Sequence, residues 1–292
     1  MRVERSIREM SIWAEKRQRY NKIVGLVPTM GALHAGHLSL VNMLENRCDI
    51  RVATILVNPL QFAENEDLDN YPRDEEADLH RLETEGCDVV FIPSPEKMFT
   101  SEFSTYVVED QLSKGLCGKY RPTHFRGVTT VVNRLFNLTA CNIAAFGLKD
   151  FQQGVVIRRM IENLFMPIKL VFGETVRAKS GLALSSRNAY LTDSERNAAT
   201  AIPRSLNWAR EQVLTRIEQS SDIKSGVEKI LTADKALKVQ YIEIVDPLTL
   251  EPLQYIATKA QLMIAVHCGS TRLIDNIEIG VNSQSKSIKL GN

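Results

Sequence analysis

This sequence lacks paired cysteines, long apolar runs and a large net charge. The five cysteines are dispersed and form no C-x-x-C pair, which disfavours disulfides and zinc and predicts reduced thiols in a cytoplasmic protein. No run approaches the roughly 20 apolar residues of a membrane helix. The first ten residues mix both charges without an apolar core, unlike a signal peptide. The formal net charge of +1 creates no field that would recruit nucleic acid or an anionic membrane.

The remaining composition is that of an ordinary globular protein. Hydrophobic residues make up 44% of the chain and charged residues 24%. A length of 292 residues is sufficient for two modest domains with separate cores. We therefore expect a soluble globular protein.

Short apolar runs alternate with helical periodicity in the first part of the chain. Strands are expected at 23–28, 50–58, 88–93, 142–147 and 168–172, with a further short strand at 105–109. Helices are expected at 6–20, after residue 37, before Gly86, around 128–138 and at 150–164. This β-α-β-α-β order predicts an α/β fold with a Rossmann-like, doubly wound parallel sheet, whose ligands bind at the C-terminal ends of the strands.

The second part of the chain has a different pattern. The TDSE sequence at 192–195 fits a capping box, predicting a long helix that Pro203 would kink, and another helix is expected at 222–232. Three alternating runs predict a short antiparallel sheet, at 238–245, 262–266 and 272–279. We predict a Rossmann-like ligand-binding domain at 1–175 and a smaller C-terminal α+β lid domain at 176–292. The polar end, 282–292, is expected to fray.

An acidic segment lies between the second and third predicted strands. It is expected to begin a helix and otherwise to be a solvated face rather than a magnesium site. Its carboxylates are Glu64, Glu66, Asp67, Asp69, Asp74, Glu75, Glu76 and Asp78.

The segment PTMGALHAGHLSL, residues 28–40, carries the strongest chemical signal. A strand, a tight turn and a helix start present free backbone N–H groups to an anion. His34 and His37 share a helical face, and without a third ligand they suit phosphate better than metal. From these residues alone, both histidines could instead simply cap or pack against the helix.

Four later segments complete a recognisable series: VNPLQF (57–62), RPTHFRGV (121–128), FGLKDFQQ (146–153) and GLALSSRN (181–188), with RLIDN (272–276) extending it. Together with the first segment, this series resembles the pantoate–β-alanine ligase (pantothenate synthetase) family. That family belongs to the nucleotidylyltransferase superfamily, which shares the H-x-G-H element with class I aminoacyl-tRNA synthetases. The resemblance implies ATP-dependent condensation of pantoate with β-alanine through a pantoyl adenylate, releasing pyrophosphate and AMP.

The resemblance also implies residue roles. His34, His37 and Lys149 would be catalytic, with His37 nearest the reacting phosphates as proton donor and Lys149 as their cationic partner. A phosphate beside His37 would favour its protonated form. Asp150 would bind ribose or cap the following helix. The implied ATP-binding set is Met30, Gly31, Ala32, Leu33, His34, Ala35, Gly36, His37, Gly147, Leu148, Lys149, Asp150, Val176, Leu184, Ser185, Ser186 and Arg187.

The uncharged amides of Gln61 and Gln153 would bind pantoate or β-alanine and leave the pantoate carboxylate nucleophilic. No metal ligand in the protein is implied, and Mg²⁺ would enter with the phosphates of ATP. The resemblance further implies a homodimer. Arg121, His124 and Arg126 form a basic cluster to which no catalytic role is given.

Two positions depart from the family pattern. Leu148 stands where a polar residue is frequent, and Ser180 stands where Asp is common. Two other functions stay open: a nucleotidylyltransferase that stops at the adenylate or makes a dinucleotide, and a nucleotide-binding protein that has lost catalysis. A tRNA synthetase is disfavoured, because a nearly neutral chain of this length scarcely accommodates an RNA-binding module.

Overall fold

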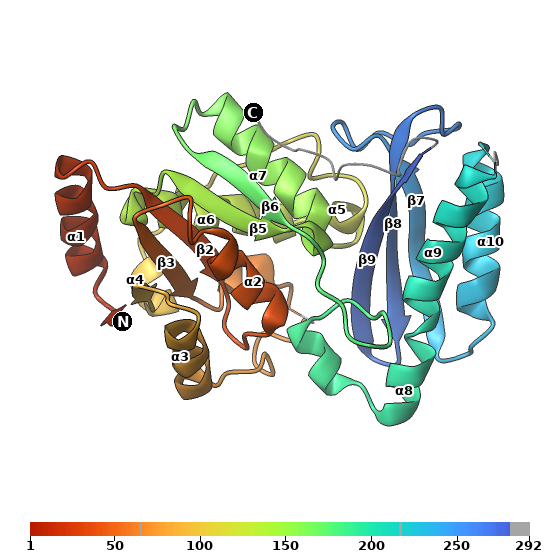
Figure 1. Ribbon diagram of the computed structural model, residues 1–292, viewed down its shortest axis with the longest axis horizontal. Helices are drawn as coiled ribbons and strands as arrows, with labels where there is room; N and C mark the ends of the chain where they lie inside the picture. Colours follow the sequence, from red (N-terminus) through yellow and green to blue (C-terminus); the bar gives the residue numbers. More distant parts are fainter. Residues whose placement is uncertain (65, 216–217, 281–292) are drawn as a thin grey trace.

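The computed structural model describes residues 1–64, 66–215 and 218–280 and contains two sheets (Figure 1). The larger sheet has six parallel strands in the order β1-β4-β3-β2-β5-β6. In chain order they are β1 (Arg2–Glu4), β2 (Val24–Thr29), β3 (Ile50–Ile55), β4 (Val89–Phe91), β5 (Ile143–Gly147) and β6 (Lys169–Gly173). This confirms the predicted parallel sheet. β1 was not predicted, because its sequence, Arg-Val-Glu, contains no apolar run.

Helices cover both faces of this sheet because its strands are apolar on both sides. Val24 and Leu26 of β2 belong to a buried cluster with Met10 and Trp13 of α1, while Val27 belongs to a second cluster, which includes residues of α2 and α3. Side chains at alternate positions of a strand point to opposite faces. The helices of the first cluster are α1 (Ile7–Arg19), α6 (His124–Thr139) and α7 (Phe151–Asn163); those of the second are α2 (Ala35–Met43) and α3 (Glu75–Thr84).

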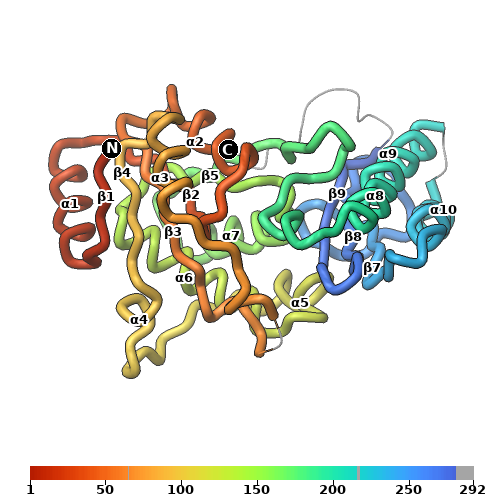
Figure 2. The backbone as a smooth tube through the Cα atoms, turned by 90° about the horizontal axis from the view of Figure 1, so that it is seen from below, coloured from red at the N-terminus to blue at the C-terminus, as the bar shows by residue number. Residues whose placement is uncertain are grey.

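The smaller sheet is antiparallel, as predicted, in the order β7-β8-β9. Apolar residues on one face pack against α9 and α10. The chain thus forms two units, one built on each sheet. The other face of the small sheet contributes Tyr241 and Met263 to a buried cluster with Phe125 and Val155 of the unit built on the large sheet. Figure 2 shows the two units along the long axis of the molecule. The elements are β7 (Leu237–Val245), β8 (Lys259–Cys268), β9 (Thr271–Gly280), α9 (Ala201–Leu214) and α10 (Ser220–Thr232).

Two predicted elements are wrong. Residues 105–109 form no strand; Val107 donates its N–H to Thr130 Oγ1 and accepts from Thr129 Oγ1, so α6 satisfies its backbone groups. The capping box at Thr192 exists but begins only the short helix α8 (Asp193–Ala198), and α9 starts separately at Ala201. Pro203 lies in the first turn of α9, where its missing N–H costs no helical hydrogen bond.

Other local predictions hold. Helix α3 begins with Asp74 as N-cap and ends before Gly86, whose φ of +71° favours glycine. The five cysteines are free thiols, and all except Cys48 are buried. The proposed boundary at 175/176 follows the last strand of the large sheet and stays a prediction. The frayed end predicted at 282–292 lies outside the described residues.

The short helices α4 (Pro95–Met98) and α5 (Cys117–Tyr120) were not predicted. Within the described ranges, no helix is both long and apolar enough to span a membrane.

Candidate active site

A cavity of about 1110 Å³ lies between the two units at the C-terminal ends of the central parallel strands. Thr29, Asn58 and Gly147 line it at or just after the ends of β2, β3 and β5. Residues of the 182–190 loop and of β9 form the opposite side. The position at the strand ends is the one that the topology predicts for a ligand.

Most of the predicted binding residues line this cavity. They are Met30, His34, Gly36, His37, Gln61, Gly147, Lys149, Asp150, Gln153, Val176, Leu184, Ser185, Ser186 and Arg187. The predicted residues Gly31, Ala32, Leu33, Ala35 and Leu148 do not line it. Leu148 instead packs against a buried cluster between the units, which places this departure from the family pattern outside the cavity.

The turn before α2 is closed by a distant carboxylate. Gly31 and Ala32 have φ values of +81° and +50°, and Asp78 accepts hydrogen bonds of 2.8 Å from the N–H groups of both Ala32 and Leu33. Arg81 donates to the Leu33 carbonyl at 2.7 Å. These amides were predicted to bind phosphate, but Asp78 already occupies them.

Asp78 also corrects the prediction of a solvated acidic face, because only 1% of it is exposed. Burial raises the pKa of its carboxyl above the usual value and outweighs the opposing effect of the two amide hydrogen bonds. Its role is to hold the left-handed turn in place.

The two histidines cap α2 with one nitrogen each. His34 is the N-cap residue: its Nδ1 accepts from the Gly36 N–H at 3.2 Å, and His37 Nδ1 accepts from the His34 N–H at 3.3 Å. Their ring centroids are 4.1 Å apart. Because each Nδ1 accepts a hydrogen bond, each neutral ring carries its proton on Nε2. The capping interpretation is therefore correct, yet it leaves an N–H donor on both rings.

Both imidazoles are neutral at pH 7 in this site. Burial lowers the pKa of His34 to about 4, with a further contribution from the charge of Lys149. Burial also lowers the pKa of His37 to about 3, aided by His34. A Cβ at Gly36 would come within 2.9 Å of the His34 ring, which explains the glycine in H-x-G-H.

Lys149 and Asp150 occupy the short helix η2 (Leu148–Asp150) directly after β5. Lys149 Nζ lies 3.6 Å from Asp150 Oδ1, and 19% of the lysine side chain is exposed. Burial raises the pKa of Asp150, but the charges of Lys149 and Arg187 more than offset this and hold it below the usual value. Asp150 makes no side-chain capping bond to α7, so the capping alternative is not formed.

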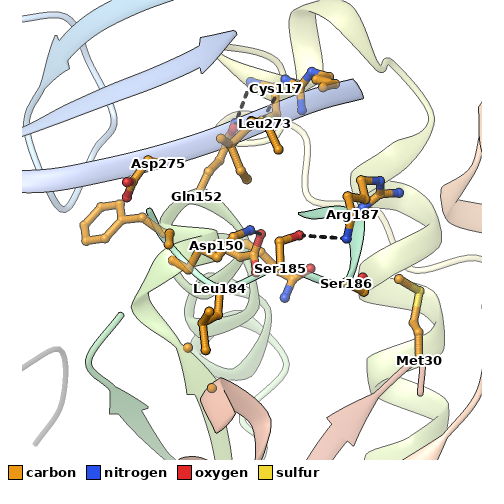
Figure 3. A pocket seen from close by; sticks show the side chains of 18 of the residues that line it. Met30, Cys117, Asp150, Gln152, Leu184, Ser185, Ser186, Arg187, Leu273 and Asp275 are labelled. Atoms are coloured by element: carbon orange, nitrogen blue, oxygen red, sulfur yellow. Dashed lines mark hydrogen bonds and ion pairs between the residues drawn. The ribbon is translucent and has the colours of Figure 1, made fainter. Parts of the chain in front are cut away.

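The loop that carries Arg187 is attached to the acidic segment across the cavity. Ser186 and Arg187 belong to the short helix η3 (Ser186–Tyr190). Arg187 forms a two-point ion pair with Asp67, at 3.0 and 2.8 Å, and Ser186 Oγ lies 3.0 Å from the Tyr71 hydroxyl. Figure 3 shows Asp150 and residues 185–187 around the same cavity.

Gln61 is held by Met30, Arg121 and His124 and by Asn58, to which the sequence analysis gave no binding role. Asn58, 1% exposed, donates to Gln61 Oε1 at 3.0 Å, and Gln61 Nε2 lies 3.1 Å from Met30 Sδ. The Gln61 carbonyl accepts from His124 Nδ1 at 2.9 Å and from Arg121 at 3.1 Å. The position of Asn58 at the end of the predicted strand 50–58 was the available signal.

Only two members of the predicted basic cluster of Arg121, His124 and Arg126 line the cavity. Arg121 pairs with Glu66 and lines the cavity together with His124, whereas Arg126 stacks over Tyr106, 4.6 Å from its ring centroid. Burial lowers the pKa of His124 to about 4, with a further contribution from Arg121, so this histidine is neutral too.

Comparison with known proteins agrees with this geometry. The model of the pantoate-beta-alanine ligase family matches residues 2–278. The chain belongs to this family. Pantothenate synthetase from Thermosipho africanus is 48% identical over 279 residues, covering 96% of this chain and all of the relative. That from Thermoanaerobacter sp. (strain X514) is 49% identical over 261 residues, covering 89% and 92%.

Solved structures of the pantoate–β-alanine ligase family share the fold. Pantothenate synthetase from Thermus thermophilus superimposes with a TM-score of 0.90 at 40% identity, covering 96% of this chain and 100% of that one. The Francisella tularensis ligase, solved with beta-gamma ATP and β-alanine, has a TM-score of 0.76 at 29% identity, covering 95% and 97%. The family membership and the fold expected from the five motifs are therefore confirmed.

Proposed function

We propose that this cavity performs the ATP-dependent condensation of pantoate with β-alanine in two steps. In the first, a pantoate carboxylate oxygen attacks the α-phosphorus of ATP, and the bond to the leaving pyrophosphate breaks. In the second, the β-alanine amine attacks the pantoyl carbonyl and the C–O bond to phosphate breaks, releasing AMP. No protein nucleophile takes part, so the side chains act by alignment and charge stabilisation.

The phosphates would lie between the histidines and Lys149. The Nε2–H groups of His34 and His37 are neutral donors of fixed tautomer, and Lys149 supplies the positive charge. Donors fixed before the reaction need no reorganisation as charge develops on the departing pyrophosphate. We assign hydrogen-bond donation to His37 in the free enzyme, since burial disfavours the protonated form that a proton donor requires.

The other predicted residues have compatible surroundings. Asp150 is an ionised carboxylate without a capping role, which suits the ribose hydroxyls. Arg187 would exchange Asp67 for phosphate oxygens, because its planar fork matches both. Gln61 and Gln153 line the cavity as uncharged amides and would bind pantoate.

Magnesium would enter with ATP and neutralise phosphate charge. We propose that the ion is held mainly by phosphates and water. In the described ranges, no three His, Cys, Asp or Glu side chains converge into a metal site. A homodimer and a cytoplasmic location stay predictions. Size-exclusion chromatography with light scattering tests the first.

The observation that carries this proposal is the pair of neutral, N–H-donating imidazoles lining the same cavity as Lys149 at the strand ends of a ligase-family fold. Product analysis tests it. The protein is incubated with ATP, magnesium and pantoate, with and without β-alanine, and AMP, pyrophosphate and pantothenate are followed.

AMP and pantothenate formed together only in the presence of β-alanine support the ligase. A stable adenylate that persists with β-alanine present would instead indicate a nucleotidylyltransferase. ATP binding without turnover would indicate a protein that has lost catalysis.

A further inference from the structure

The amide of Asn276 on β9 holds the turn that carries Lys149. Its Nδ2 donates to the carbonyl of Leu148 at 3.0 Å and to that of Lys149 at 2.8 Å. Asn276 is 6% exposed and lies in the small sheet, whereas η2 follows a strand of the large sheet. A side chain of one unit therefore fixes the backbone beside the phosphate-binding cation of the other.

The orientation of this amide is determined by its partners. Gln261 on β8, 3% exposed, donates from Nε2 to Asn276 Oδ1 at 2.6 Å. A flipped Asn276 amide would place its oxygen against two carbonyl oxygens and its NH₂ against another NH₂ group. All three hydrogen bonds thus require the observed orientation.

The preceding residue ties the same strand to the second nucleotide loop. Asp275, 3% exposed, accepts from Arg177 Nη1 at 2.6 Å and from Arg177 Nη2 at 3.0 Å. Arg177 also donates to the Gly181 carbonyl at 3.1 Å, in the loop that leads to Ser185 and Arg187. Adjacent residues of β9 therefore hold both loops proposed to bind ATP; Figure 3 shows Asp275 at this strand.

We propose that Asn276 is a positioning residue for adenylation, which acts through the Leu148 and Lys149 carbonyls to place Lys149 against the phosphates. This inference rests on the proposed function, in which Lys149 is the phosphate cation. Its chemical consequence follows from geometry: a displaced cation stabilises the departing pyrophosphate less, and a misplacement of about 1 Å can cost about 100-fold in rate.

The experiment is a double-mutant cycle on adenylation. Asn276→Asp keeps the side-chain shape but replaces the double donor with an acceptor. Pantoate-dependent exchange of labelled pyrophosphate into ATP is measured for the wild type, Asn276→Asp, Lys149→Ala and the double variant. We expect Asn276→Asp to lower the exchange rate about 10- to 100-fold in the wild type but less than about threefold in the Lys149→Ala background.

A matched control comes from Gln152, another buried amide. Its Nε2 donates to the carbonyls of Leu112 and Gly115, both at 2.9 Å, in a loop that does not carry Lys149. Gln152→Glu therefore removes the same type of contact. We expect Gln152→Glu to change the exchange rate by the same factor with and without Lys149, whatever the size of that factor. If Asn276 had a merely structural role, Asn276→Asp would give this additive result too.

The outcomes separate this inference from the proposed function. A wild-type exchange rate in folded Asn276→Asp, or an equal loss in both backgrounds, overturns the role of Asn276. A wild-type exchange rate in Lys149→Ala overturns the role of Lys149 itself. If Asn276→Asp does not fold, Asn276→Ala is used instead, because it removes both donors without adding charge. The inference then requires Asn276→Ala to lower the exchange rate more in the wild type than in the Lys149→Ala background.

Discussion

The two sides of the cavity are built differently. The histidine side, residues 30–37, is held by hydrogen bonds that it makes within itself and to the buried Asp78. The arginine side, residues 184–190, is held across the cavity by Arg187 pairing with the partly exposed Asp67. On one side the backbone amides and the ring Nδ1 atoms are hydrogen-bonded within the protein, which fixes the two Nε2–H donors. The other side has a cation whose partner can be exchanged.

This difference separates two functions. Rigid donors on the histidine side suit the stabilisation of developing charge, which requires fixed geometry. An exchangeable arginine suits the capture of a substrate that carries its own anionic groups. We therefore expect changes on the histidine side to affect turnover and stability, and changes on the arginine side to affect ATP affinity.

The largest expected effect is that of His37→Ala on turnover. Removing a fixed donor to the transition state should lower kcat at least about 100-fold. Steady-state pantothenate formation measures it, and His80→Ala, at an exposed helix position, is the matched control. Near-normal turnover of His37→Ala would remove the role that we give to this ring.

Asp78→Ala, on the histidine side, should lower the free energy of unfolding more than Asp67→Ala, on the arginine side. It leaves the Ala32 and Leu33 amides without their partner and should cost about 2–4 kcal/mol of unfolding free energy. Asp67→Ala breaks only a partly exposed ion pair and should cost about 1 kcal/mol or less. Urea denaturation of the two variants compares them directly, and equal losses would contradict a difference in rigidity.

Acidification should weaken the histidine side selectively. The pKa values of His34 and His37, about 4 and 3, lie below the unfolded value of 6.5, so the unfolded chain binds more protons between these values. Their contribution to stability is therefore present above pH 6.5 and is lost as the pH falls toward 4.

Thermal unfolding between pH 7.5 and 4.5 measures this contribution. The wild type should lose more Tm on acidification than His34→Gln or His37→Gln. His124, with a pKa of about 4, adds to the wild-type slope and persists in both variants. Parallel slopes in all three proteins would show that the two imidazoles are not held neutral.

The smallest expected effect is the change in the KM for ATP when the ion pair between Arg187 and Asp67 is broken. Asp67→Asn removes the carboxylate that competes with phosphate for Arg187, so the KM for ATP should fall, by no more than about fivefold. Arg187→Ala should raise this KM by about tenfold or more, since it removes charge-assisted hydrogen bonds. An increase in the KM of Asp67→Asn would show that Asp67 assists ATP binding instead.

The sequence predicted the large sheet because its strands are apolar runs with clear helical periods between them. The family resemblance supplied the site residues, and the strand ends near His34 and Lys149 agreed with it. Long-range partners were not predictable in this way. Asp78 lies in an acidic segment whose composition is that of a solvated surface, and its bond to Leu33 joins residues 45 positions apart.

The same reason explains the other errors. The amides of Ala32 and Leu33 were expected to be free because nothing local satisfies them. Asn276 looked like one residue of a strand, because periodicity gives the face of a residue but not its partner in another unit. The break between α8 and α9 depends on packing in the small unit, which the capping box at Thr192 does not encode.

The most direct measurement follows oxygen through the reaction. Pantoate labelled with ¹⁸O in its carboxylate is converted by the wild-type protein with ATP and β-alanine, and the AMP is analysed by mass spectrometry. Formation of a pantoyl adenylate transfers one labelled oxygen to the AMP phosphate and leaves the other in the pantothenate amide carbonyl. AMP without label, together with full pantothenate yield, would contradict adenylate formation in this cavity.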